Sequence, residues 1–240
     1  MRRPHRDKVS KEHRKLTAPA FLFDLDGTLV DSVYQHVLAW REALEAAGIE
    51  LAVWRIHRRI GMSGGLLVNA LLRETGSKVT SSEITNIQQL HTEAYRRLTK
   101  QLRMLPGARE LLSYLTEAGI PWAIATSGRM ENARSALDIL GVGPDVTVVT
   151  RDQVHYAKPD PDLFMAAASR LGVQLENAIV VGDSIWDMLA ARRARALGVG
   201  LLSGGYGQDE LERAGAYRVY DDPADLRRHL DEVGIRTMHT

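Results

Sequence analysis

The sequence contains no cysteine. A disulfide framework, a thiolate metal site and a cysteine nucleophile are therefore excluded, and any metal ion must be held by oxygen or imidazole ligands. Long apolar runs are also missing: no stretch approaches the roughly 18 apolar residues that span a bilayer, and the N-terminus lacks the apolar segment of a signal peptide. We therefore expect a cytoplasmic protein without a membrane partner.

The composition shows no extreme. Of the 240 residues, 45% are hydrophobic and 25% are charged, which excludes wholesale disorder and collagen-like or coiled-coil chains. At roughly 150 residues per domain, the length favours one large domain or a core domain that carries a smaller insertion.

The net charge of +1 is unevenly distributed. Residues 1–16 hold seven basic and two acidic side chains, a net charge of +5, which leaves −4 on the remainder. This segment has no interleaved aromatic residues and no nucleic-acid-binding motif. We expect residues 1–18 to form a solvated, poorly ordered leader, and we do not expect nucleic acid as a partner.

The first third of the chain predicts one strand followed by helices. Residues 20–25 form an apolar run that ends in acidic residues, which predicts a strand that leads into a turn. From residue 32, apolar residues three and four apart predict a helix that stops at Gly48. They are Val33, Val37, Trp40, Leu44 and Ala47. Further helices are expected at 66–72 and 84–98, with Gly61, Gly64 and Gly65 breaking the chain between the helices.

From residue 106 onward, helices and short apolar strands alternate. Helices are expected at 108–118, 131–140, 162–171 and 184–197, and each precedes a strand, at 122–126, 146–150, 178–181 and 198–202. A last strand at 217–220 and a helix at 223–233 complete the pattern. Such alternation is typical of βαβ units around a parallel sheet. The predicted fold is α/β: a doubly wound parallel sheet formed by residues 19–32 and 106–240, with an all-helical cap inserted at 33–105.

Polar groups occur just beyond several of the predicted strands. They belong to four segments: Asp24-Leu25-Asp26-Gly27-Thr28, Thr126-Ser127-Gly128, Lys158-Pro159 and Gly182-Asp183-Ser184-Ile185-Trp186-Asp187. In open parallel sheets, ligands bind outside the carboxyl ends of the strands. Several carboxylates at one sheet edge repel one another unless a cation holds them together, and oxygen ligands without cysteine point to Mg²⁺. A lysine and a threonine hydroxyl would bind the oxygens of an anion, so the combination indicates phosphoryl transfer.

The order of these motifs resembles that of the haloacid dehalogenase superfamily, and the resemblance covers residues 21 to about 205. The gap of 102 residues between Asp24 and Thr126 matches the helical cap that this family inserts after its first strand. Only 32 residues separate Thr126 from Lys158, which is too short for a second cap there.

The resemblance implies a role for each motif residue. Asp24 would be the nucleophile that forms an aspartyl-phosphate, and Asp26 would be the general acid and base. Thr126, Ser127, Gly128 and Lys158 would bind the phosphoryl oxygens, with Lys158 also neutralising Asp24. Mg²⁺ would be held by the Asp24 carboxylate, the Asp26 backbone carbonyl and Asp183, while Asp187 would either approach the metal through water or orient Lys158.

The same residues also have purely structural interpretations. Asp24 and Asp26 could be turn formers, Thr126 could cap the following helix and Asp183 could cap the next one, and Lys158 could be a solvated lysine. Asp31 and Ser32 are typical of the start of a helix, and we assign them no chemistry.

The acid two residues after the nucleophile, Asp26, favours phosphate esters over carbon–halogen or carbon–phosphorus bonds, again by resemblance. The chain is similar to phosphoglycolate phosphatases and related small sugar-phosphate phosphatases, so we expect a small phosphorylated metabolite as the substrate. His36 in the cap also resembles a cap histidine of β-phosphoglucomutase, which leaves a phosphotransferase as the alternative. However, the mutase holds its second phosphate with a cap-loop arginine, where this chain has glycine within residues 60–64.

Three further residues are candidates for substrate selection: His36, Ser63 and Arg129. His36 could instead be a partly buried surface histidine, and Arg129 a solvated arginine at a helix start. A catalytically silent relative that binds a phosphorylated ligand or a protein through its cap is a third possibility, but none of Asp24, Asp26, Lys158 and Asp183 is lost.

Overall fold

A six-stranded sheet lies at the centre of the protein. The computed structural model describes residues 19–75 and 80–235, so the predicted leader at 1–18 lies outside the described residues. The strands are β1 (Ala20–Phe23), β4 (Trp122–Ala125), β5 (Val148–Val149), β6 (Ala178–Gly182), β7 (Leu197–Leu201) and β8 (Ala216–Tyr220). They lie in the order β5-β4-β1-β6-β7-β8, and every neighbouring pair is parallel.

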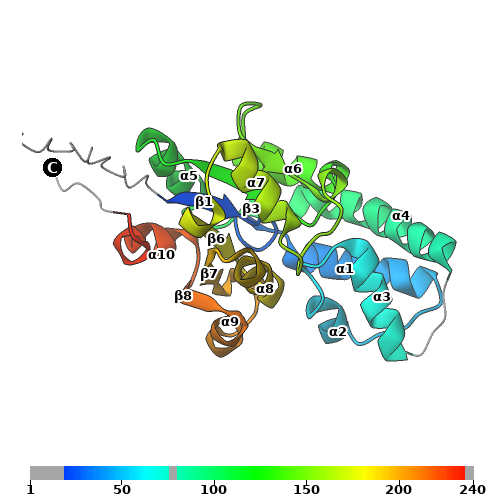
Figure 1. Cartoon of the computed structure of the whole chain (residues 1–240). Coiled ribbons are helices and arrows are strands. Elements are labelled where there is room, and N and C mark those ends of the chain that lie inside the picture. Colours follow the sequence, from blue (N-terminus) through cyan, green and yellow to red (C-terminus); the bar gives the residue numbers. More distant parts are fainter. Residues whose placement is uncertain (1–18, 76–79, 236–240) are drawn as a thin grey trace, which may run out of the picture.

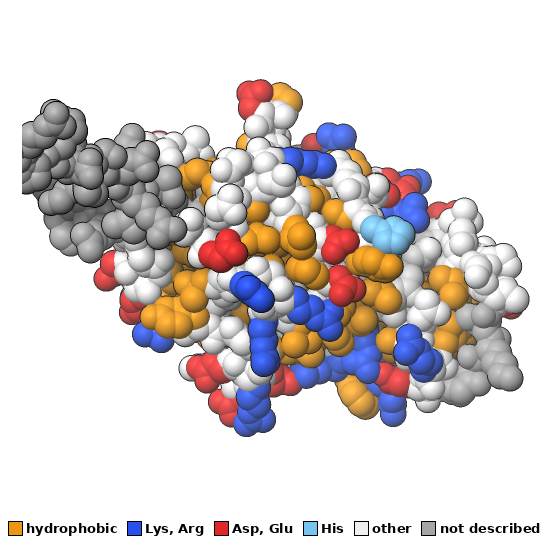
Figure 2. All heavy atoms as spheres, in the orientation of Figure 1, with side chains coloured by type: hydrophobic (Ala, Val, Ile, Leu, Met, Phe, Trp, Pro, Cys, Tyr) orange, Lys and Arg blue, Asp and Glu red, His pale blue; other side chains and the backbone are white. Residues whose placement is uncertain are grey.

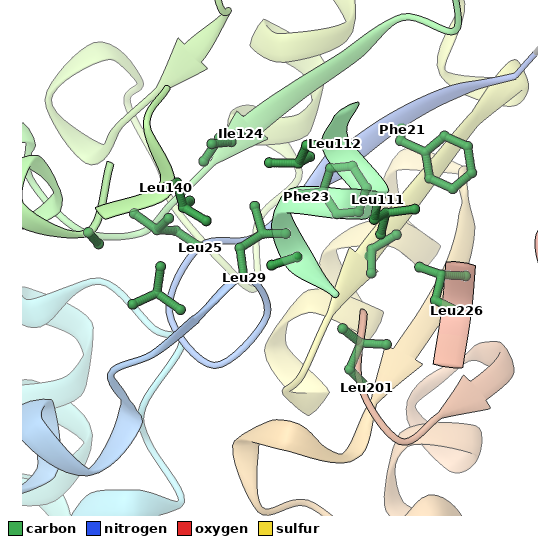
Figure 3. Close-up of a cluster of buried hydrophobic side chains, with 14 of the residues drawn as sticks. Phe21, Phe23, Leu25, Leu29, Leu111, Leu112, Ile124, Leu140, Leu201 and Leu226 are labelled. Atoms are coloured by element: carbon green, nitrogen blue, oxygen red, sulfur yellow. The ribbon is translucent and has the colours of Figure 1, made fainter. Parts of the chain in front are cut away.

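Helices cover both faces of this sheet (Figure 1). Alternate residues of a strand point to opposite faces, and in β1 Phe21 and Phe23 join one hydrophobic cluster whereas Leu22 joins another. The first cluster, part of which Figure 3 shows, includes residues of α5 (Ala108–Glu117), α6 (Met130–Leu140) and α10 (Pro223–Arg228). The second includes residues of α7 (Asp162–Leu171) and α8 (Ile185–Ala194). The predicted doubly wound parallel sheet is therefore confirmed.

Four helices between β2 (Val30–Asp31) and β3 (Arg103–Met104) form the inserted cap. They are α1 (Val33–Ala46), α2 (Val53–His57), α3 (Gly64–Thr75) and α4 (Ser81–Leu98), and they gather at one end of the molecule (Figure 1). Their apolar sides pack into a cluster of their own around Val37, Trp40 and Leu71. The cap thus buries a hydrophobic core separate from the two beside the sheet.

The chain passes between the core and the cap twice, and the two connecting segments form a short antiparallel pair. After a short 3₁₀ turn, η1 (Thr99–Gln101), the chain forms β3 (Arg103–Met104), which pairs antiparallel with β2 (Val30–Asp31). The insertion predicted as all-helical therefore ends in a two-residue strand. The hydrophobic pattern did not show this pair, because two residues are too few to display alternation.

Several element boundaries differ from prediction for local reasons. Ala47 is exposed, because α1 ends at Ala46 and Gly48 then adopts a positive φ of +74°. Gly64 and Gly65 do not break the chain but begin α3. A Cβ at Gly64 would lie 3.1 Å from the Trp40 ring, so glycine permits the close approach of α3 to α1.

The C-terminal third also contains differences. The helix predicted at 184–197 ends at Ala194, because Arg195 takes a positive φ of +58°, and β7 begins at Leu197. The segment predicted as one helix at 223–233 is α10 followed by the 3₁₀ turn η5 (Leu230–Val233). Two short helices were not predicted: α2 and α9 (Gln208–Ala214).

Figure 2 shows acidic, basic and hydrophobic side chains interspersed over one face of the protein. Within residues 19–75 and 80–235, no helix has the length and apolar character that crossing a membrane requires.

Candidate active site

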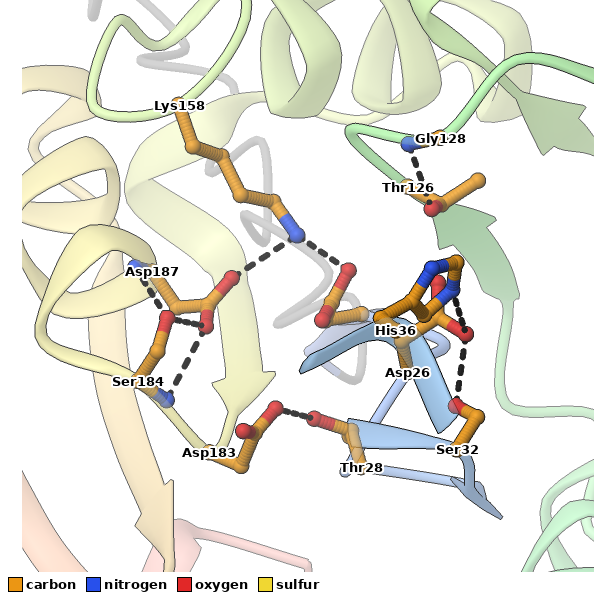
Figure 4. A network of polar contacts seen from close by, with 11 residues as sticks. Asp26, Thr28, Ser32, His36, Thr126, Gly128, Lys158, Asp183, Ser184 and Asp187 are labelled. Carbon is orange, nitrogen blue, oxygen red and sulfur yellow. Dashed lines mark hydrogen bonds and ion pairs between the residues drawn. The ribbon is translucent and has the colours of Figure 1, made fainter. Parts of the chain in front are cut away.

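The predicted polar segments meet at one edge of the sheet. Asp24, Thr126 and Asp183 directly follow β1, β4 and β6, which are neighbours in the sheet with β1 in the middle. Lys158 reaches the same edge from the chain between β5 and α7 (Figure 4). The carboxyl ends of parallel strands meet at one edge, so residues far apart in the sequence become neighbours.

Lys158 is completely buried between two carboxylates. Its Nζ contacts Oδ1 of Asp24 and lies 2.8 Å from Oδ1 of Asp187 (Figure 4). Burial disfavours the charged form, but the negative charges of Asp187 and Asp24 outweigh that effect and raise the pKa of Lys158. The interpretation of Lys158 as a solvated lysine is therefore wrong.

Asp24 is only 3% exposed. Burial raises the pKa of its carboxyl to about 7, although the charge of Lys158 acts in the opposite direction. Asp187 and Asp26 add to the rise because like charges disfavour ionisation. A positive charge beside Asp24 therefore favours the ionised form, which is the form a nucleophile requires.

Asp187 connects Lys158 with the start of α8. Its Oδ2 accepts hydrogen bonds from the backbone N–H of Ser184, at 3.1 Å, and from the Ser184 hydroxyl, at 2.5 Å. Ser184 is the N-cap of α8, so the alternative in which Asp183 caps this helix is wrong. Of the two positions considered for Asp187, the structure shows the contact with Lys158.

Asp183 lies in a tight space next to the turn that follows β1. Its Oδ1 accepts a hydrogen bond of 2.9 Å from the hydroxyl of Thr28, and burial, followed by the charges of Asp187 and Asp24, raises its pKa well above the ordinary value. A Cβ at Gly27 would lie 2.5 Å from Oδ2 of Asp183, and one at Gly204 would lie 1.7 Å from it. The carboxylate thus occupies space that only glycine leaves free.

Asp26 points away from the other carboxylates and toward the cap. Its Oδ1 accepts a hydrogen bond of 2.6 Å from the Ser32 hydroxyl and lies 3.3 Å from Nε2 of His36 (Figure 4). Burial acts to raise the pKa of Asp26, but His36 and Ser32 together outweigh it and lower the pKa. Ser32 makes no side-chain capping bond to α1, so the prediction that it only begins the helix was incomplete. His36 is buried against Asp26 and is not a surface histidine.

The segment after β4 presents hydroxyl groups beside Asp26. The Oγ1 atom of Thr126 accepts a hydrogen bond of 3.0 Å from the backbone N–H of Gly128. Thr126 does not cap the next helix, because the N-cap of α6 is Arg129. The hydroxyl of Ser127 is buried and has no hydrogen-bond partner among the described residues, so it is free to bind an anion at this position.

A cavity of about 1290 Å³ lies between this edge of the sheet and the cap. Asp24, Asp26 and Thr126 line its base, and His36 and Ser63 line its cap side. Arg129 also lines the cavity, so all three residues predicted to select the substrate, His36, Ser63 and Arg129, border it. The Arg129 side chain is 57% exposed, and its Nη1 lies 3.9 Å from Oδ1 of Asp152.

The buried carboxylates at this edge of the sheet form a donor set that fits Mg²⁺. Asp24, Asp183 and Asp187 are buried, and one carboxylate oxygen from each lies within 4.8 Å of the others. Hard oxygen donors are the ligands that Mg²⁺ prefers. The side chain of Asp26 is not part of this group. A contact between its backbone carbonyl and the metal stays a prediction.

The family model for haloacid dehalogenase-like hydrolases matches residues 18–195. The chain belongs to this family. The matched range includes Asp24, Thr126, Lys158 and Asp183, so every predicted motif of this hydrolase lies within it.

Several relatives have names that state an activity. Hexitol phosphatase A from Escherichia coli is 36% identical over 72% of this hydrolase and 78% of its own length. A phosphoglycolate phosphatase from Rhodospirillum rubrum is 32% identical over 86% of this chain and 88% of its own length. A β-phosphoglucomutase from Bacillus subtilis is 30% identical over 88% of this chain and 92% of its own length. The crystal structure of a hydrolase from Pseudomonas syringae superposes with a TM-score of 0.89 at 56% identity, covering 90% of this chain and all of that one.

Three features of this hydrolase were not found from the sequence. Ser32 was assigned no chemistry, and His91 of α4, whose Nε2 lies 3.1 Å from Nδ1 of His36, was not considered. Gly204 lies next to Asp183 because β7, which precedes Gly204, is the parallel neighbour of β6 in the sheet. The position of Ser32, six residues after Asp26, could have indicated its contact with Asp26. No local sequence pattern marks His91 or Gly204.

Proposed function

We propose that the protein is a Mg²⁺-dependent phosphatase that hydrolyses a small phosphorylated metabolite through an aspartyl-phosphate. The observation that carries this proposal is the division of labour between two aspartates: Asp24 faces the buried cation Lys158, whereas Asp26 faces Ser32 and His36. Two carboxyl groups two residues apart therefore have different surroundings and different partners, which allows them to take different roles in one site.

In the first step, a carboxylate oxygen of Asp24 forms a bond to phosphorus, and the bond from phosphorus to the ester oxygen breaks. Lys158 favours the ionised form of Asp24 and neutralises part of the phosphoryl charge. Asp26 must enter this step protonated, as the second step leaves it, and it delivers that proton to the departing oxygen, which leaves as an alcohol. The products of this step are the alcohol and a phosphoryl group on Asp24.

In the second step, the carboxylate of Asp26 takes a proton from water. The resulting hydroxide oxygen bonds to phosphorus, and the bond between phosphorus and the Asp24 oxygen breaks. Phosphate is released, Asp24 is restored and Asp26 is again protonated. His36 and Ser32 hold Asp26 at the cavity in both steps.

Asp24, Asp183 and the backbone carbonyl of Asp26 would hold Mg²⁺, which when bound offsets the negative charge of the phosphoryl group. Thr126, Ser127 and Gly128 would bind the phosphoryl oxygens with Lys158. Thr126 accepts from Gly128, so its own hydroxyl proton is left to donate, and the buried Ser127 hydroxyl is a second donor.

The substrate that we propose resembles phosphoglycolate or a sugar phosphate, in keeping with the names of the relatives. Residues 33–105 would act as the cap that closes over it, with residues 19–32 and 106–240 as the catalytic core. The loop at residues 60–64 carries no lysine or arginine to hold a second phosphate, which favours hydrolysis over mutase chemistry.

The test is a panel of phosphorylated metabolites assayed for phosphate release with and without Mg²⁺. Release that depends on Mg²⁺ and falls about 10²- to 10⁴-fold for an alkyl ester in Asp26→Asn is the expected result. Conversion of a hexose 1-phosphate to the 6-phosphate that is faster than release to water would contradict the proposal and support the phosphotransferase. Failure to turn over any ester, with binding retained, would indicate a silent phospho-ligand-binding relative.

A further inference from the structure

A chain of three polar groups runs from the core into the cap. Oδ1 of Asp26 lies 3.3 Å from Nε2 of His36, and Nδ1 of His36 lies 3.1 Å from Nε2 of His91. Asp26 belongs to the turn after β1, His36 to α1 and His91 to α4. Both ring nitrogens of His36 are therefore engaged, one by the core and one by the cap.

His91 is buried and stacks against an aromatic ring. It is 4% exposed, and its ring stacks on Trp40 with the centroids 3.9 Å apart. Tyr95, one turn further along α4, stacks on His36 at 3.8 Å with an interplanar angle of 6°. Trp40 of α1 and Tyr95 of α4 flank the contact between the two histidines and leave little room for the His36 ring to turn.

Burial lowers the pKa of His91 well below the ordinary value, and the charge of His36 acts in the same direction against a weaker opposing effect of Asp26. His91 is thus a neutral imidazole, with one nitrogen that donates and one that accepts. Its Nε2 can complete a hydrogen bond with Nδ1 of His36 without bringing a second positive charge into the cap.

We propose that His91 is a positioning residue for the acid and base chemistry assigned to Asp26. By its hydrogen bond to Nδ1 of His36, it keeps the Nε2 atom of His36 directed at the Asp26 carboxyl. This inference rests on the proposed function. The hydrogen bond made by one ring nitrogen of a histidine determines what the other can do, so loss of His91 frees the His36 ring and leaves Ser32 alone to orient Asp26.

The contact also relates the chemistry to the position of the cap. His36 and His91 both come from cap helices, whereas Asp26 belongs to the core. The chain from Asp26 through His36 to His91 therefore joins the core to two helices of the cap.

The experiment compares two esters in the full-length protein with Mg²⁺. Nitrophenolate leaves from p-nitrophenyl phosphate without a proton, whereas an alkyl ester such as glycerol 3-phosphate needs one. The measured quantity is the ratio of kcat/KM for the alkyl ester to kcat/KM for the aryl ester. We expect His91→Phe, which keeps a flat ring next to Trp40 but removes Nε2, to lower this ratio about 10-fold.

Conservative variants give a second readout. The side-chain amide nitrogen of glutamine is placed where Nε2 of histidine lies, and that of asparagine is placed where Nδ1 lies. We therefore expect His91→Gln to keep most of the wild-type ratio of alkyl to aryl kcat/KM, and His91→Asn to lower it. If His91→Phe does not fold, this pair decides the question. Equal ratios in the glutamine and asparagine variants, or a wild-type ratio in His91→Phe, would overturn the proposal.

Two further variants separate the possible failures. Leu71→Ala removes buried volume from the cap core away from the cavity, and it should lower both activities together without changing the ratio. Asp26→Asn should lower the ratio more than any His91 variant. If Asp26→Asn leaves the ratio unchanged, the proposed function itself is wrong; if only the His91 variants leave it unchanged, the role of His91 is wrong.

Discussion

The ammonium group of Lys158 lies 2.8 Å from Oδ1 of Asp187, and both side chains are completely buried. Removing one partner from a buried pair is more costly than losing a surface ion pair, although Asp24 would still face Lys158 after the loss of Asp187. Asp187 also accepts from Ser184 at the start of α8, so the helix and the cation are held by the same carboxylate.

Asp187→Asn keeps an oxygen for Ser184 but removes the charge that faces Lys158. We expect kcat to fall about 10- to 100-fold and the free energy of unfolding to fall by about 1–3 kcal/mol. Steady-state kinetics and urea unfolding measure the two effects. Asp209→Asn is the control, because the Asp209–Arg213 pair is mostly exposed, and it should change neither quantity. Wild-type kcat in Asp187→Asn would show that Lys158 does not need this partner.

Asp24→Asn should abolish phosphate release while the fold persists, because an amide cannot attack phosphorus. Circular dichroism checks the fold, and acid quenching followed by mass spectrometry checks for a phosphorylated residue. The wild type should carry the phosphoryl group on Asp24 and the variant should carry none. A phosphoryl group trapped on another residue would refute the assignment.

Chelation with EDTA should stop turnover, and added Mg²⁺ should restore it, because Asp24 and Asp183 otherwise crowd negative charge around a dianionic substrate. Ca²⁺ should substitute poorly, since it prefers a looser and larger coordination sphere. Phosphate release is measured across a titration of each ion. Full activity after exhaustive chelation would be incompatible with a metal-dependent mechanism.

Gly204→Ala should lower kcat/KM about 10- to 100-fold and weaken the response to Mg²⁺, because the new Cβ would lie 1.7 Å from Oδ2 of Asp183 and must displace that carboxylate. Gly143→Ala is the matched control, since a Cβ there meets nothing within 4 Å. A Gly204→Ala enzyme with the same Mg²⁺ dependence as Gly143→Ala would show that the position of Asp183 is not critical.

Ser63→Ala should change the order in which substrates are preferred more than Arg129→Ala does. The Ser63 side chain is buried at the cap side of the cavity, whereas Arg129 is mostly exposed and lies near Asp152. His36→Ala should also change the order, because His36 lines the cap side above Asp26. The measurement is kcat/KM for phosphoglycolate and several sugar monophosphates, with the Mg²⁺ response as the unchanged reference. An unaltered order in all three variants would place substrate selection elsewhere in the cap.

The sequence by itself determined the class of fold and the base of the site. Apolar strands alternating with amphipathic helices require a covered parallel sheet, and polar residues just beyond β1, β4 and β6 must then lie at the same edge. Asp24, Thr126 and Asp183 follow from that rule alone. The place of Lys158 came from its motif and not from its own surroundings, because a lysine in a loop is ordinarily solvated.

Only the tertiary structure decided which side chains surround these residues. The side chain of Ser32, the N-cap residue of α1, bonds Asp26 and not the helix backbone. His91 reaches His36 although it lies 55 positions later, and Gly204 makes room for Asp183. Each of these contacts depends on how whole elements pack, and close packing is a property of the assembled elements that no local pattern encodes. Periodicity specifies which face of a helix is buried, but not which residue of another helix lies against it.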